Sequence, residues 1–182
     1  MIRGVESPIF YRSVENVESS AQTEILDSPI MAVVVEDEDD IREMIGIWLE
    51  SEEVVVLGQF GSRKEFFESA GIIQDDITGE YSQDPNKSKL NGNKPELVVT
   101  DLGIKGEGDT VGCDVTRAAK KIFGSYTVVE SGNGEVRGYT REKQKEMGID
   151  EFVQKPFDPS KLASDAVVHV KQARNQKSQK AS

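Results

Sequence analysis

The sequence contains very little cysteine and histidine, the residues that form disulfides and bind zinc. Its 182 residues include one cysteine, Cys113, and one histidine, His169. A single cysteine excludes an internal disulfide and a cysteine-based zinc site. His169 has no second ligand spaced as a zinc site requires. We expect Cys113 to pack as a small apolar residue and His169 to be a surface or half-buried residue of a helix.

Long apolar runs and positive charge are also scarce. No stretch approaches the ~20 apolar residues of a membrane span, and the first residues lack the apolar centre of a signal peptide. The formal charge of -11 disfavours a nucleic-acid-binding surface and suits metal cations or basic partner surfaces. We therefore expect a cytoplasmic protein that binds neither membrane nor nucleic acid.

Composition divides the chain into three parts. Residues 1–29 are polar and predict a flexible N-terminal extension, for which a partner-binding role stays open. Residues 30–173 alternate strand and helix patterns and are long enough for one domain with a buried core. Within them, residues 71–94 are rich in polar residues and glycine, which predicts a flexible surface insertion. Residues 174–182 predict a disordered tail.

Short apolar runs alternate with helical patterns along the domain. The predicted strands are 30–35, 54–57, 97–101, 126–129 and 150–154, and the predicted helices are 41–49, 62–70, 113–123, 134–147 and a last helix from about Pro159. This alternation implies right-handed crossovers. We predict an α/β fold with a doubly wound, five-stranded parallel sheet in the flavodoxin-like order 2-1-3-4-5 and helices on both faces.

Two helix starts carry capping signals. Asp39 or Asp40 is expected to cap the first helix, and acidic residues there suit the helix dipole. Ser62 and Glu65 have the spacing of a capping box before the second helix.

Carboxylates follow two of the predicted strands. Glu36 and Asp37 come directly after the first strand, and Asp101 ends the third. Ligands of such folds bind beyond the carboxyl ends of the strands, and the predicted order makes these two strands neighbours. Asp101 taken alone is explained as well by capping of the following turn. Together, however, carboxylates ~4 Å apart repel by about 4 kcal/mol each, so the cluster needs a cation, and Mg²⁺ prefers oxygen ligands.

Ser131 and Lys155 follow the fourth and fifth strands at the same edge. A hydroxyl and an ammonium supply hydrogen bonds and positive charge to phosphoryl oxygens. Beside a carboxylate and metal cluster, these two groups are what a bound phosphoryl group needs.

Four motifs, in this order, make the chain resemble the receiver domain of two-component response regulators, most closely those without an attached output domain. The motifs are Val-Val-Val-Glu36-Asp37-Glu38, Pro95-Glu-Leu-Val-Val-Thr-Asp101-Leu102, Ser131-Gly132 and Phe152-Val-Gln-Lys155-Pro156-Phe157. Each motif alone is weak, whereas all four on successive strand ends are specific. The resemblance covers about residues 31–170.

The resemblance implies a chemical role for each acidic residue. Asp101 would be the phosphoacceptor and would take a phosphoryl group from a histidine of a sensor kinase or phosphotransfer protein. Asp37 would bind Mg²⁺ directly, Glu36 would bind it through water, and the backbone carbonyl of Gly103 would add a ligand. The protein would then catalyse only its own phosphorylation and dephosphorylation.

The resemblance also implies a conformational switch. Ser131 would hydrogen-bond a phosphoryl oxygen, Lys155 would pair with Asp101 or its phosphate, and Phe152 would turn inward as the Ser131 hydroxyl moves. A shift of the fourth helix and fifth strand would then control a downstream protein target. Pro156 matches a position whose preceding peptide bond is usually cis in this family.

The segment after Asp101 departs from the family pattern. The loop is about three residues longer than usual, and Lys105 stands where proline is common. Gly103 has no side chain to shield the phosphoryl site. We hypothesise that water reaches the site there and that the phosphorylated state is short-lived.

Three other hypotheses use the same residues. A haloacid-dehalogenase-like phosphohydrolase needs a second aspartate two residues after its nucleophile, where Gly103 stands. A flavin-binding module of the same fold cradles phosphate after the first strand, where the acids from Glu36 to Asp40 would repel it. A receiver-shaped scaffold that takes no phosphate is disfavoured, because every chemical position is filled.

Overall fold

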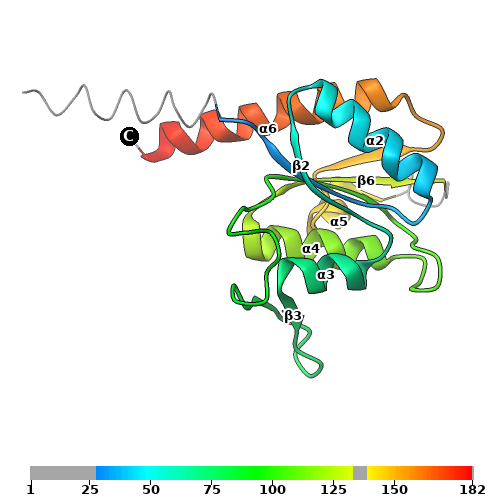
Figure 1. The fold of residues 1–182 in the computed structure, drawn as a ribbon, viewed down its shortest axis with the longest axis vertical. Helices are drawn as coiled ribbons and strands as arrows, with labels where there is room; N and C mark the ends of the chain where they lie inside the picture. Colours follow the sequence, from blue (N-terminus) through cyan, green and yellow to red (C-terminus); the bar gives the residue numbers. More distant parts are fainter. Residues whose placement is uncertain (1–27, 133–138, 182) are drawn as a thin grey trace, which may run out of the picture.

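A five-stranded parallel sheet forms the centre of the fold (Figure 1). The computed structural model describes residues 28–132 and 139–181. The strands are β1 (Met31–Val35), β2 (Val55–Phe60), β5 (Leu97–Asp101), β6 (Tyr126–Ser131) and β7 (Glu151–Gln154). They lie in the order β2-β1-β5-β6-β7, and each adjacent pair is parallel. This is the predicted order 2-1-3-4-5, so the predicted fold class is confirmed.

Helices cover both faces of this sheet (Figure 1). One face carries α2 (Asp39–Ser51) and α6 (Pro159–Ala181), and the other carries α3 (Arg63–Ala70) and α4 (Val111–Phe123). Alternate residues of a strand point to opposite faces, so Val99 packs under α2 and α6 while Val98 packs under α3 and α4. None of the helices within the described ranges is long and apolar enough to span a membrane.

The two capping predictions have different outcomes. The N-cap of α2 is Glu38, whose side chain makes no capping hydrogen bond, so the prediction that Asp39 or Asp40 caps this helix is wrong. Both aspartates lie in the first turn, where their charges still favour the helix dipole. At α3, the Ser62 hydroxyl accepts a hydrogen bond from Glu65 N at 3.1 Å, as predicted.

The helix predicted at 134–147 is described only in part, and the helical segment within the described residues is short. Helix α5 covers Arg141–Glu146, and its N-cap is Thr140, whose hydroxyl accepts a hydrogen bond from Lys143 N. Residues 134–138 of the predicted helix lie outside the described residues. No side chain of α5 is buried, so its packing adds little to hold a longer helix.

The predicted insertion at 71–94 contains a β-hairpin. Strands β3 (Ile72–Gln74) and β4 (Tyr81–Gln83) pair antiparallel and extend from the end of α3 (Figure 1). The hydroxyl of Tyr81 donates to Asp114 Oδ1 of α4 at 3.2 Å, which ties the hairpin to the domain. Each of these strands has only three residues. A strand this short leaves no clear pattern in a polar segment, so the sequence predicted a loop.

Helix α6 continues past residue 173 to Ala181. Arg174 is buried, and its guanidinium donates to Glu96 at 2.9 and 2.6 Å and to the carbonyl of Ser28 at 2.6 Å. The prediction of disorder from residue 174 is therefore wrong for this helical part. The predicted boundary of the N-terminal extension stays a prediction, because residues 1–27 lie outside the described part.

Candidate functional site

The carboxyl ends of β1, β5 and β7 bring Glu36, Asp101 and Lys155 together. Lys155 Nζ donates to Glu36 Oε2 at 2.8 Å and to Asp101 Oδ1 at 2.9 Å. The two carboxylates are neighbours because Val35 pairs with Thr100 one residue earlier on their strands. Glu36 is fully buried and Asp101 is 8% exposed, so this is an ion-pair cluster largely shielded from water.

Backbone amides hold the remaining oxygens of this cluster. Glu36 Oε1 accepts from Glu38 N at 3.0 Å, and Asp101 Oδ2 accepts from Gly103 N at 2.8 Å. Each of the four carboxylate oxygens therefore has a donor. The side chains are held in one orientation before any ligand arrives.

Asp37, unlike Glu36 and Asp101, does not bind Lys155. It is half-buried and makes no hydrogen bond or ion pair with any residue in the described ranges. Its oxygens, with those of Glu36 and Asp101, are the ligands that Mg²⁺ prefers, so the donor set fits this ion chemically. No three His, Cys, Asp or Glu side chains of the described part are arranged to hold a metal. Lys155 donates to two of the three carboxylates, so a metal ion would compete with the ammonium for these oxygens.

Ser131 and Phe152 are the two residues of the predicted switch, and they lie on the adjacent strands β6 and β7. Ser131 ends β6, is 4% exposed, and its carbonyl accepts from Lys155 N at 2.9 Å. Phe152 in β7 is half-buried and packs against a core cluster that includes Met147. The peptide bond between Lys155 and Pro156 is cis, as the resemblance implied.

Comparison with known proteins identifies the fold. No protein-family model matches the chain, and no curated protein matches it. Among solved structures, the receiver domain protein (CheY-like) of Methanospirillum hungatei JF-1 has a TM-score of 0.58 at 15% identity and covers 82% of this chain and 99% of its own. The REC domain of AraT, a response regulator from Geobacillus stearothermophilus, has a TM-score of 0.57 at 17% identity, with 82% and 98% covered. DrrB, a response regulator and OmpR/PhoB homolog of Thermotoga maritima, has a TM-score of 0.52 at 18% identity. The chain has the response regulator receiver fold.

The match extends over the whole receiver unit of these proteins. Coverage of the Methanospirillum and Geobacillus chains is nearly complete, whereas this chain spans 50% of the DrrB chain. The receiver fold places the carboxyl ends of β1, β5 and β7 at one edge of the sheet, which is where Glu36, Asp101 and Lys155 meet.

Glu130 is a third buried carboxyl at this edge, and sequence reasoning did not select it. It directly precedes Ser131 and pairs in register with Asp101, so both side chains point to the same face of the sheet. Glu130 is fully buried, and neither of its carboxyl oxygens has a hydrogen-bond partner among the described residues. An acid inside the apolar run of β6 was the available signal.

Burial and charge act in opposite directions on these groups. Burial, followed by the neighbouring carboxylates of Glu36 and Asp101, raises the pKa of Glu130 to about 9, although the Lys155 charge opposes this. Burial lowers the pKa of Lys155, but its hydrogen bonds to Glu36 and Asp101 outweigh burial and raise it above the usual value. Lys155 is therefore cationic near pH 7, whereas Glu130 is mostly neutral.

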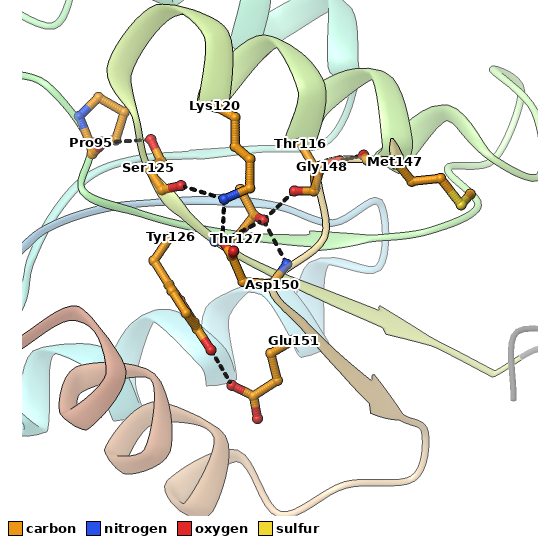
Figure 2. A network of polar contacts seen from close by, with 10 residues as sticks. All are labelled: Pro95, Thr116, Lys120, Ser125, Tyr126, Thr127, Met147, Gly148, Asp150 and Glu151. Carbon is orange, nitrogen blue, oxygen red and sulfur yellow. Dashed lines mark hydrogen bonds and ion pairs between the residues drawn. The ribbon is translucent and has the colours of Figure 1, made fainter. Parts of the chain in front are cut away.

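A polar network at the amino ends of β6 and β7, away from Lys155, fixes the start of β7 (Figure 2). Asp150 Oδ2 accepts from Thr127 N at 2.8 Å and from Lys120 Nζ at 2.5 Å. Thr127 Oγ1 donates to the carbonyl of Gly148 at 2.5 Å. These bonds set the register of β7 against β6 and thus the position of Lys155 at its far end.

Gly112 allows α4 to begin directly against the end of β5. Its amide donates to the carbonyl of Leu102 at 2.9 Å. A Cβ atom at this position would lie 2.1 Å from the carbonyl oxygen of Asp101. The close approach therefore requires glycine, a requirement that becomes visible only in the packed structure.

Proposed function

We propose that the protein is a two-component receiver that accepts a phosphoryl group on Asp101. The donor is a phosphohistidine of a sensor histidine kinase or phosphotransfer protein. The observation that carries the proposal is the Lys155 ammonium, bound to Asp101 and Glu36 at the carboxyl edge of a parallel sheet. A cation beside a buried carboxylate offsets the charge that a phosphoryl group would bring.

In the transfer step, a carboxylate oxygen of Asp101 attacks the phosphorus atom. The new P–O bond forms as the P–N bond to the donor imidazole breaks, and the electron pair of that bond stays on the ring nitrogen. The amide of Gly103 holds one Asp101 oxygen at 2.8 Å, which orients the nucleophile. Lys155 stays near the product and offsets its added negative charge.

The residues that would hold Mg²⁺ are Glu36, Asp37, Asp101 and the backbone carbonyl of Gly103. When bound, the ion neutralises phosphoryl oxygens and helps to align the donor with Asp101. Asp37 supports this assignment because its carboxylate makes no interaction with the rest of the described chain.

The phosphorylated protein would act on a downstream protein target and not on a separate substrate, in the cytoplasm and without binding nucleic acid or membrane. Ser131 would bind a phosphoryl oxygen, and Phe152 would respond within its core cluster. Helix α5, which buries no side chain, would change position at low cost. The surface around β7 and α5 would thereby report the state of Asp101.

The test is phosphorylation with acetyl phosphate, with and without Mg²⁺, read by intact mass and by the fluorescence of Trp48. We expect one phosphoryl adduct that requires Mg²⁺ and is absent from Asp101→Asn. Asp109→Asn, an exposed carboxylate in the following loop, is the matched control and should be labelled like wild type. Steady turnover of p-nitrophenyl phosphate would instead favour the phosphohydrolase hypothesis.

A further inference from the structure

Three buried carboxyls, those of Glu36, Asp101 and Glu130, lie near the Lys155 ammonium at this site. Glu36 and Asp101 are both hydrogen-bonded to Lys155, whereas Glu130 has two unpartnered oxygens among the described residues. Glu130 is 0% exposed, so it has no access to bulk water. An unpartnered buried carboxyl opposes folding, and its position inside β6 needs an explanation that packing does not supply.

Glu130 lies within reach of Lys155. It pairs with Val153 of β7, and Lys155 follows two residues later on the same face. Strand spacing and rise put the two backbone positions about 8 Å apart, a gap that two long side chains close. The ammonium has three donors, and two of them are used, on Glu36 and Asp101.

In the proposed function, a metal ion and a phosphoryl group would compete with Lys155 for oxygens of Glu36 and Asp101. Lys155 now binds one oxygen of each. A buried ammonium released without a new acceptor would carry a large desolvation cost. Of these buried carboxyls, Glu130 is the one whose oxygens are unpartnered within the described residues.

We propose that Glu130 is a positioning residue that accepts a hydrogen bond from the Lys155 ammonium when Glu36 turns to the metal ion. This inference rests on the proposed function of the site. Glu130 thereby keeps the ammonium beside Asp101 while its first partner is withdrawn. The step needs an oxygen acceptor at residue 130, so glutamine can replace glutamate and leucine cannot.

The test measures Mg²⁺ binding by titration calorimetry in wild type, Glu130→Gln and Glu130→Leu. We expect glutamine to keep the dissociation constant within about threefold of wild type and leucine to raise it at least about tenfold, the scale of a lost buried hydrogen bond. Melting temperatures without Mg²⁺ accompany the titrations, and Glu130→Leu should be no less stable than wild type. Weaker metal binding by an equally stable protein is not what a purely structural role predicts.

The outcomes separate this inference from the proposed function. If wild type is labelled on Asp101 but Glu130→Leu binds Mg²⁺ like wild type, or Glu130→Gln loses as much affinity as leucine, the positioning role is overturned and the proposed function stands. If wild type binds no Mg²⁺, both are overturned. Should Glu130→Leu not fold, Glu130→Met, which has a similar length and no oxygen acceptor, replaces it. The ¹⁵N resonance of Lys155 Nζ, which should move on Mg²⁺ addition in wild type and differ in the leucine variant, is a second readout.

Discussion

Replacing Glu130 by glutamine should stabilise the protein at neutral pH and reduce the pH dependence of its stability. The substitution keeps the shape of the side chain but removes its titration. In the folded protein, burial raises the pKa of Glu130 to about 9 from an ordinary value of 4.5. Above pH 4.5 the unfolded chain therefore loses this proton while the folded protein keeps it.

The direction in which stability changes with pH follows from this difference between the folded and unfolded pKa of Glu130. A group whose pKa is raised in the folded state contributes most to stability below its unfolded pKa, and this contribution falls as the pH rises toward the folded pKa. Each pH unit changes the free energy of unfolding by about 1.4 kcal/mol. Glu130 should therefore cost up to about 3 kcal/mol of stability at pH 7 and less than about 1 kcal/mol at pH 5.

Urea unfolding in EDTA, followed by the fluorescence of Trp48 on α2, measures this difference at each pH from 5 to 8. The free energy of unfolding of Glu130→Gln should exceed that of wild type by an amount that grows with pH. Glu50→Gln, an exposed acid on α2, is the matched control. Its difference from wild type should stay within about 0.5 kcal/mol at every pH.

A gap between Glu130→Gln and wild type that does not widen between pH 5 and pH 8 would refute this reasoning. It would mean that Glu130 is ionised in the folded protein and therefore has a cationic partner at rest. Lys155 would be that partner, and its hydrogen bonds to Glu36 and Asp101 would have to be shared among three carboxylates.

Other substitutions test separate parts of the site. Gly112→Ala should lower the free energy of unfolding by about 1–3 kcal/mol, because its Cβ would lie 2.1 Å from the Asp101 carbonyl oxygen; an unchanged urea midpoint would contradict the close packing of α4. Asp150→Ala should lower the free energy of unfolding by about 1–3 kcal/mol, because Lys120 Nζ and Thr127 N would lose their acceptor. Asp76→Ala, at an exposed position, should not lower it. Equal losses in the two variants would argue against the network. Gly103→Arg should slow loss of the phosphoryl adduct, measured by intact mass, since the position is exposed and a Cβ atom there would make ordinary van der Waals contact with the Asp109 backbone, 3.4 Å away. An unchanged hydrolysis rate would reject the water-path hypothesis.

The fold was predictable because its signals are local and repeated. Each central strand is a short apolar run, and β5 is buried along its whole length, as a parallel sheet covered on both faces requires. Strand order then followed from the handedness of the crossovers and the choice of a flavodoxin-like arrangement. Glu36, Asp101 and Lys155 were predictable for the same reason, because each stands where a strand ends.

Features that depend on pairing between distant segments were not predictable. Glu130 appeared as the last residue before Ser131, and only the register of β6 against β5 shows that it shares a face with Asp101. The helical part of the predicted tail depends on Arg174, which binds Glu96 far away in the chain. Sequence periodicity contains no information about either contact.

The proposed function gives Lys155 one role without a bound metal ion and another role with it. Without a metal, Lys155 is the positive charge that lets Glu36 and Asp101 lie side by side in a buried position. In the proposed function, an arriving metal ion would take over that role, so the energy needed to move Lys155 would be subtracted from the binding energy of the metal. Metal affinity would then depend on the group that receives Lys155 as much as on the oxygens that bind the ion. Glu130, whose two carboxyl oxygens have no hydrogen-bond partner among the described residues, would be the residue that sets this cost under our proposal.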